Sequence, residues 1–264
     1  MTDVSREKIT VQGLPTAYAV QGAGPAAVLA LHGWGGNIES FWPVAQQLAP
    51  LGSYTIYVLD LPGFGETAPP PEPWGVPEYA DFVLAFLDAL GLDRMHLLGH
   101  SFGGRISLIL GADHADRVDK MVLANSAGVP NPPNPLRDSA VKAAKSVLGL
   151  PGLKRLYEPT RRKAYEQLGA TDYLDAGALQ ETFVKVVAQD LLPYAARISR
   201  PTLLVWGDQD QDTPLWQGKK LAQTIPGAGL VEYAGAGHFS YLDRLPDYVR
   251  VVNFFLTDDS EGTA

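Results

Sequence analysis

A serine between two glycines, placed after an apolar strand and before a helix, constrains this chain most. The sequence reads Gly-His-Ser-Phe-Gly at residues 99–103. The apolar run 95–98 is typical of a buried strand, and residues 105–110 begin a helical pattern. A chain that turns sharply from strand to helix needs close backbone contacts, which glycines permit. The motif therefore predicts that Ser101 is a nucleophile held at a strained turn with its hydroxyl pointing outward.

A serine hydroxyl is a weak nucleophile at neutral pH and needs a base that accepts its proton. The histidines of the chain are His32, His96, His100, His114 and His238. His238 follows the last predicted strand in Gly-Ala-Gly-His-Phe, where small residues permit a tight loop. His100 is adjacent to Ser101, so its side chain should point away from the hydroxyl. We therefore predict that His238 is the general base.

The base in turn needs a carboxylate that fixes its tautomer and stabilises the imidazolium. The loop after the next-to-last predicted strand carries Asp208, Asp210 and Asp212. Asp210 lies in the middle of this loop, from which a side chain can reach His238, and Asp208 is the alternative. Asp212 is expected to cap the helix that begins near Pro214.

Acyl transfer also needs two N–H groups that bind the developing oxyanion. Phe102 supplies one at the start of the helix after the serine. The turn Leu-His-Gly-Trp-Gly-Gly at residues 31–36 should supply the other, from Trp34 or alternatively from Gly35. The residues predicted to line the substrate pocket are His32, Gly33 and Phe239.

Apolar strands and amphipathic helices alternate along most of the chain. Strands are predicted at 9–11, 16–20, 26–31, 54–59, 95–98, 120–124, 202–206 and 230–233, and helices at 38–48, 79–90, 105–110, 214–224 and 248–255. This alternation predicts an α/β fold with a mostly parallel sheet covered on both faces. Residues 1–125 and 199–264 form the predicted core. Residues 126–198 contain helical patterns without a convincing strand and form a predicted cap.

Taken together, these motifs resemble the α/β-hydrolase fold family. The resemblance is carried by residues 31–35, 60–65, 99–103, 206–210 and 237–239 and by the order Ser, Asp, His along the chain. It implies an eight-stranded sheet with an antiparallel second strand and a small helical cap after the sixth strand. It supports Asp210 as the acid and makes His32 and Asp60 structural supports. The other position for the acid, after the sixth strand, reads Leu-Ala-Asn-Ser at 123–126 and has no carboxylate.

The serine nucleophile narrows the reactions that this resemblance implies. Family members that carry an aspartate in place of this serine cleave haloalkanes and epoxides. Ser101 therefore argues against those reactions for this chain. We expect hydrolysis of carboxylic esters with small to medium acyl groups. One alternative is a carbon–carbon bond hydrolase of ring-cleavage products, for which the turn at Trp34 and the residue Phe239 fit less well. Another alternative is a ligand-sensing protein with a slow hydrolase site.

Composition limits the remaining possibilities. The chain has 264 residues, a formal net charge of −8 and no cysteine, which rules out disulfides and a thiol nucleophile. The acidic balance predicts no binding to nucleic acid and no attachment to an anionic membrane. The polar N-terminus lacks the apolar core of a signal peptide, so we expect a cytoplasmic protein, monomeric or homodimeric. No spacing of histidines and carboxylates indicates a metal site, and no glycine pattern indicates an organic cofactor. The expected partner is the small-molecule ester substrate.

Overall fold

An eight-stranded sheet and its connecting helices form the described part of the chain, residues 4–132 and 176–258 of the computed structural model. In chain order the elements are β1 (Arg6–Val11), β2 (Leu14–Gly22), β3 (Ala26–Leu31), α1 (Ile38–Leu48), η1 (Ala49–Leu51), β4 (Tyr54–Leu59), α2 (Val76–Leu90), β5 (Met95–His100), α3 (Phe102–Asp113), η2 (Ala115–Arg117), β6 (Val118–Ala124), η3 (Gly177–Leu179), α7 (Gln180–Ala188), α8 (Leu192–Ala195), β7 (Thr202–Gly207), α9 (Leu215–Thr224), β8 (Gly229–Tyr233), α10 (Ser240–Asp243) and α11 (Leu245–Thr257). Within these ranges, no helix combines the length and apolar character needed to cross a membrane.

The sheet confirms the predicted α/β-hydrolase topology. Its strand order is β1-β2-β4-β3-β5-β6-β7-β8, in which β2 is antiparallel to both neighbours and the strands from β4 to β8 pair in parallel. The order reverses between β3 and β5, because the chain moves from β3 to β4 on one side and from β5 to β6 on the other. Ligands of open parallel sheets bind in the crevice beyond the carboxyl ends of the strands at such a point. The loops after β3 and β5 therefore occupy the expected place of a site.

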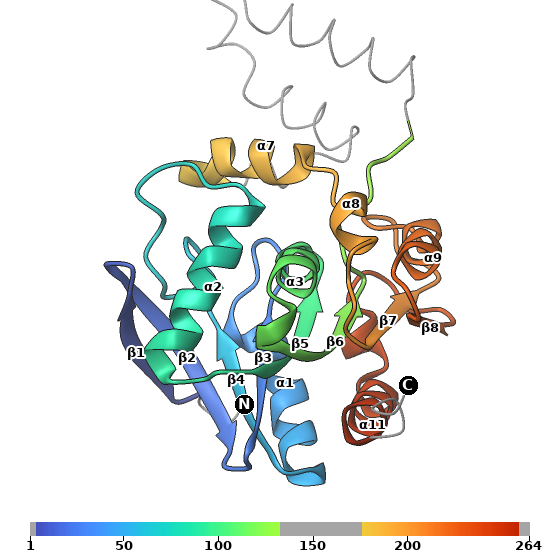
Figure 1. Cartoon of the computed structure of the whole chain (residues 1–264), viewed down its shortest axis with the longest axis horizontal. Coiled ribbons are helices and arrows are strands. Elements are labelled where there is room, and N and C mark those ends of the chain that lie inside the picture. Colours follow the sequence, from blue (N-terminus) through green and yellow to red (C-terminus); the bar gives the residue numbers. More distant parts are fainter. Residues whose placement is uncertain (1–3, 133–175, 259–264) are drawn as a thin grey trace, which may run out of the picture.

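Alternate residues of the central strands pack into two separate apolar cores. In β3, Leu29 and Leu31 pack with residues of α2 and α3, whereas Val28 and Ala30 pack with residues of α1 and α11. Figure 1 shows α3 and α8 above the sheet and α1 and α11 below it. Such nearly continuous apolar strands are typical of parallel sheets buried on both faces.

The first two strands are joined by a tighter turn than the sequence indicates. The predicted strands 9–11 and 16–20 leave residues 12–15 between them, but the turn consists only of Gln12 and Gly13, with φ of 49° and 81°. Two successive residues with positive φ match the hairpin turn whose twist suits the flanking strands. Pro15 is accommodated near the beginning of β2, where a strand tolerates proline.

The predicted cap, residues 126–198, lies largely outside the described residues. The structure describes 126–132 and 176–198 of it, which contain η3, α7 and α8 and no strand. Helix α7 is joined to the core by a hydrogen bond from the Trp74 N–H to the Thr182 hydroxyl at 3.2 Å. Figure 1 shows α7 beyond α2 and α3, on the side to which the arrows of the parallel strands point.

Candidate active site

Ser101 lies at the junction of β5 and α3 in a strained backbone conformation. Its φ of 49° and ψ of −104° fall outside the regions that residues with a side chain ordinarily adopt. Its N–H donates to the Ala124 carbonyl at 3.2 Å, and its own carbonyl accepts the Arg105 N–H at 3.2 Å. The neighbouring structure therefore holds the strain, as is common at functional sites.

Two glycines beside Ser101 allow the strand, the helix and the neighbouring strand to approach closely. A Cβ at Gly99 would lie 2.6 Å from the Ser107 Oγ, and a Cβ at Gly103 would lie 2.0 Å from the Leu31 carbonyl oxygen. The second contact is with the backbone of β3, which cannot move aside. The close packing of β5, α3 and β3 therefore requires glycine at positions 99 and 103, as the sequence motif has it.

Asp210 is the predicted aspartate that reaches His238. Its Oδ2 lies 2.9 Å from the His238 Nδ1. The alternative, Asp208, instead accepts a hydrogen bond from the Gly235 N–H at 2.8 Å. A buried carboxylate beside an imidazole nitrogen can fix the tautomer of the ring and stabilise its protonated form.

The surroundings of Asp210 keep its carboxylate ionised. Oδ2 also accepts the Thr213 hydroxyl at 2.7 Å and the Asn125 Nδ2 at 2.5 Å, while Oδ1 accepts the N–H groups of Asp212 and Thr213 at 2.9 and 3.0 Å. Burial alone would raise the pKa of Asp210, but the hydrogen bonds from His238, Thr213 and Asn125 together lower it. The ionised carboxylate accepts a hydrogen bond from the Nδ1–H group, so the other ring nitrogen of His238 is free of a proton and can accept one.

The expected role of Asp212 as a helix cap is wrong. Helix α9 begins at Leu215, its N-cap is Pro214, and no side chain caps it. Proline in the N-cap position leaves Asp212 two residues too early to cap the helix. Asp212 instead donates its N–H to Asp210 and lines the cavity described below.

Asn125 belongs to the site but was not predicted from the sequence. Residues 123–126 were considered only as a place for the catalytic carboxylate, which they lack. Its Nδ2 donates to Asp210, its Oδ1 accepts the Ser240 hydroxyl, and its N–H donates to the Val205 carbonyl at 2.9 Å. It thereby joins the ends of β6 and β7 to the segment that follows His238. A buried polar residue directly after an apolar strand is the signal that could have indicated it.

His100 supports the loop that carries His238. The two rings are 4.8 Å apart between centroids, and the His100 Nε2 lies 3.0 Å from the His238 carbonyl oxygen. A carbonyl only accepts, so the proton of the His100 ring is on Nε2. Burial, together with the nearby His238, lowers the pKa of His100 to about 3, which keeps this ring neutral.

His32 and Asp60 hold the turn after β3 in place. The buried His32 donates from Nδ1 to the Gly33 carbonyl at 2.7 Å and accepts the Leu61 N–H on Nε2 at 3.0 Å. The Asp60 Oδ1 accepts the Ile38 N–H at the start of α1 at 2.7 Å. His32 is not among the residues that line the cavity, contrary to its predicted place in the pocket, because both ring nitrogens are bound to backbone.

Buried His32 should make the protein less stable in mild acid. Burial lowers the pKa of His32 to about 4, so between pH 6.5 and 4 the unfolded chain binds a proton that the folded chain does not. Stability is therefore complete above pH 6.5 and falls as the pH decreases, by about 2 kcal/mol at pH 5 from this group alone. His32→Gln can keep both hydrogen bonds and should lose about that much less free energy of unfolding between pH 7 and pH 5. Urea unfolding at both pH values measures the difference, and equal losses in the two proteins would contradict it.

The glycine-rich turn after β3 is fixed to the start of α3. The His32 carbonyl accepts the Gly103 N–H at 3.0 Å, and a Cβ at Gly33 would lie 3.2 Å from the Ser101 Cβ. Phe102 is the first residue of α3, so its N–H has no acceptor within the helix. Backbone from two different loops thus lies beside Ser101.

A cavity of about 430 Å³ opens at this edge of the sheet. Its lining includes Gly33, His100, Ser101, His238 and Phe239. This volume lies within the range of small-molecule sites. No hydrogen bond joins the Ser101 hydroxyl to His238 among the described residues; in many hydrolases this bond tightens only when substrate binds.

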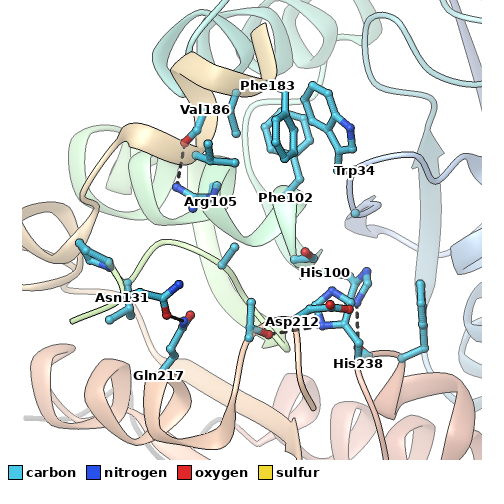
Figure 2. A pocket seen from close by; sticks show the side chains of 18 residues that line it. Trp34, His100, Phe102, Arg105, Asn131, Phe183, Val186, Asp212, Gln217 and His238 are labelled. Atoms are coloured by element: carbon cyan, nitrogen blue, oxygen red, sulfur yellow. Dashed lines mark hydrogen bonds between the residues drawn. The ribbon is translucent and has the colours of Figure 1, made fainter. Parts of the chain in front are cut away.

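The cavity has an aromatic side and a polar side. The Trp34 ring packs edge-on against Phe102 and Phe183, with centroids 5.4 and 5.0 Å away. Figure 2 shows these three rings together, with Arg105 beside Val186 and with Asn131 and Gln217 across the cavity. The aromatic side suits an apolar group, and the polar side suits hydrogen-bonding groups.

The family model described as the alpha/beta hydrolase fold matches residues 26–163 and 170–245 of this sequence. The chain belongs to the α/β hydrolase fold family. The chain is 27% identical to the 2-hydroxy-6-oxononadienedioate/2-hydroxy-6-oxononatrienedioate hydrolase of Cupriavidus pinatubonensis, over 94% of each chain. The enol-lactonase of Burkholderia xenovorans is similar in structure, with a TM-score of 0.73, 25% identity, and coverage of 96% of this chain and 100% of that one.

A further relative of this α/β hydrolase is longer. The chain is 29% identical, over 90% of its length, to the dihydrolipoyllysine-residue acetyltransferase component of the acetoin cleaving system of Cupriavidus necator. It spans 65% of that protein, so the similarity concerns only part of the relative.

One group of ligand atoms in this hydrolase could be taken for a metal site. Within residues 4–132 and 176–258, Asp210, Asp212 and His238 offer ligand atoms within 4.8 Å of one another. The Asp210 oxygens already accept hydrogen bonds from side chains and backbone, including one from His238 itself. The Asp210 and His238 atoms are therefore engaged with each other, so these two residues fit a catalytic pair better than a pair of cation ligands.

Proposed function

We propose that this α/β hydrolase is a serine hydrolase that cleaves carboxylic esters of small to medium acyl groups through an acyl-enzyme. The observation that carries the proposal is the hydrogen bond of 2.9 Å from Asp210 to His238, which lines the same cavity as Ser101. The strained backbone of Ser101 supports its role as nucleophile, since such strain is found at strand-to-helix elbows.

In the proposed mechanism, His238 accepts the proton of Ser101 while the serine oxygen attacks the ester carbonyl. The N–H groups of Phe102 and Trp34 bind the oxyanion of the tetrahedral intermediate. His238 then gives its proton to the leaving alcohol, and Asp210 stabilises the imidazolium throughout. A water molecule, deprotonated by His238, hydrolyses the acyl-enzyme and restores Ser101.

A second candidate is carbon–carbon bond hydrolysis of ring-cleavage products. It is favoured by the relative from Cupriavidus pinatubonensis, whose name states such a substrate. The aromatic side of the cavity, formed by Trp34, Phe102 and Phe183, could accommodate a conjugated chain as well as an acyl group. Substrate assays therefore have to separate the two reactions.

Purified protein offered 4-nitrophenyl esters of increasing acyl length beside a ring-cleavage dienoate tests both candidates. We expect saturable turnover of the esters with kcat/KM at least tenfold above that of the dienoate. A fluorophosphonate should stop the reaction and label one peptide at Ser101. Preference for the dienoate would replace the first candidate by the second. Labelling elsewhere would refute the assigned nucleophile, and a single slow turnover with a stable adduct would favour a ligand-sensing role.

A further inference from the structure

Arg105 places a buried positive charge on the wall of the cavity. It lies one helical turn after Ser101, since its N–H donates to the Ser101 carbonyl at 3.2 Å. Its side chain is 9% exposed and lines the cavity on the side away from Trp34 (Figure 2). Because residues one turn apart share a face of a helix, the guanidinium lies within reach of a molecule bound at Ser101.

The guanidinium has only carbonyl partners among the described residues. Nη1 donates to the Val186 carbonyl at 2.9 Å and to the Gln189 carbonyl at 3.1 Å. Both carbonyls belong to the C-terminal end of α7, where carbonyls lack partners within the helix. Within the described ranges no carboxylate forms an ion pair with Arg105, and its Nε and Nη2 make no hydrogen bond. The anchoring of α7 therefore uses one nitrogen of the three.

A buried cation without an anion is costly, and the cost is reduced when an anion binds beside it. Burial lowers the pKa of Arg105 to about 10, so the guanidinium still carries its charge at neutral pH. Gln217, 3% exposed, also lines the cavity, and its Nε2 donates to the Asn131 Oδ1 at 3.3 Å. The cavity wall thus carries a positive charge at Arg105 and a further hydrogen-bonding group at Gln217.

We propose that Arg105 binds a carboxylate of the substrate, so that this hydrolase prefers acyl chains that end in an acid over neutral chains of equal length. The inference rests on the proposed function, of which it specifies the substrate class. In the proposed geometry, Nε and Nη2 of Arg105 donate to the two carboxylate oxygens, and the apolar part of the substrate packs toward Trp34. A planar guanidinium fork matches a carboxylate in this way.

The test compares mono-(4-nitrophenyl) adipate with 4-nitrophenyl hexanoate, which differ in a terminal carboxylate. The measured quantity is the ratio of kcat/KM for the charged ester to that for the neutral one. We expect this ratio to fall about 10-fold to 100-fold in Arg105→Gln, the loss typical of one charge-assisted hydrogen bond or a pair of them. Gln retains an N–H donor for the end of α7.

Arg250→Gln is the matched control, because Arg250 is an exposed arginine of α11 that pairs with Asp247. It removes the same charge far from the cavity and should leave the ratio within about twofold of the wild type. If Arg105→Gln lowers kcat/KM equally for both esters, Arg105 only anchors α7 and the proposal is overturned. An equal fall of the ratio in Arg250→Gln would also overturn it, because net charge would explain the preference.

Binding to Ser101→Ala provides a measurement that needs neither turnover nor a change of Arg105. Calorimetry should give a dissociation constant at least about tenfold lower for the adipate monoester than for the hexanoate ester. Equal affinities would overturn the carboxylate site. If the wild type hydrolyses neither ester but Ser101→Ala shows this preference, the proposed ester hydrolysis fails while the anion site stands.

Discussion

Ser101→Ala is expected to lower kcat for ester hydrolysis by about 10⁴-fold to 10⁶-fold while the fold remains intact. In the proposed mechanism the serine oxygen forms the covalent bond to the acyl group, and alanine has no atom that can replace it. The only activity that remains should come from binding the ester near the oxyanion donors. The measurement is single-turnover kinetics with a 4-nitrophenyl ester, checked for contaminating wild-type enzyme.

The fold should tolerate this change because the contacts that hold residue 101 are made by its backbone. Its N–H and carbonyl are bound to Ala124 and Arg105, and alanine retains both bonds. The positive φ is equally strained for serine and alanine, so the melting temperature should change by no more than a few degrees.

Ser107→Ala is the control for loss of a hydroxyl on the same helix. The Ser107 hydroxyl is buried and donates to the Gly103 carbonyl at 2.8 Å, away from the cavity lining. Its loss should cost about 1 kcal/mol of stability and change kcat by less than about threefold. A Ser101→Ala enzyme that keeps more than about one tenth of the wild-type kcat would refute the assignment of the nucleophile.

Sequence reasoning was most successful where local chemistry decides the structure. The glycine spacing around Ser101 reflects contacts that are short and local, and the end of α2 at Gly91 reflects its positive φ of 67°. Helix α1 runs from Ile38 to Leu48 as its apolar spacing predicts. The antiparallel second strand of the eight-stranded sheet, by contrast, was implied only by the family resemblance, because no short stretch of sequence shows which distant strands pair with each other.

The residues that the sequence could not place depend on contacts between distant segments. Asn125 matters because β6 and β7 end side by side, which brings it to Asp210, 85 positions later. Arg105 reads as an ordinary polar residue of an apolar helix, and its partners lie more than 80 positions away. Asp212 does not cap α9 because the N-cap of this helix is Pro214. Helix propensities do not fix the first residue of a helix closely enough to predict this.

Asp210→Asn is expected to lower kcat by about 10⁴-fold, the second-largest effect in this hydrolase. The carboxylate faces donors on every side: the His238 ring, the Thr213 hydroxyl and the Asn125 amide on Oδ2, and two backbone N–H groups on Oδ1. Asparagine can present its oxygen to only one of these two sets of donors, either the three at the position of Oδ2 or the two at the position of Oδ1. Whichever way its amide is turned, an NH₂ meets donors.

If the amide nitrogen faces His238, the ring must take its other tautomer and can no longer accept the proton of Ser101. If it faces the backbone of Asp212 and Thr213, two N–H groups lose their acceptor, which should cost about 1–3 kcal/mol of stability. The two backbone N–H groups cannot turn away, so we expect the amide oxygen to face them and the amide nitrogen to face His238. That orientation also leaves the Asn125 Nδ2 without its acceptor, so the variant should combine a large loss of kcat with a measurably lower midpoint in urea.

Asp208→Asn separates the catalytic role from the loss of a carboxylate in this loop. Asp208 accepts from the Gly235 N–H and from the Gln209 side chain and makes no hydrogen bond to His238. Its asparagine variant should keep kcat within about threefold of the wild type, because the amide oxygen can still accept from Gly235. If Asp208→Asn were the damaging change and Asp210→Asn the mild one, the 2.9 Å contact between Asp210 and His238 would not be the one that orients the base.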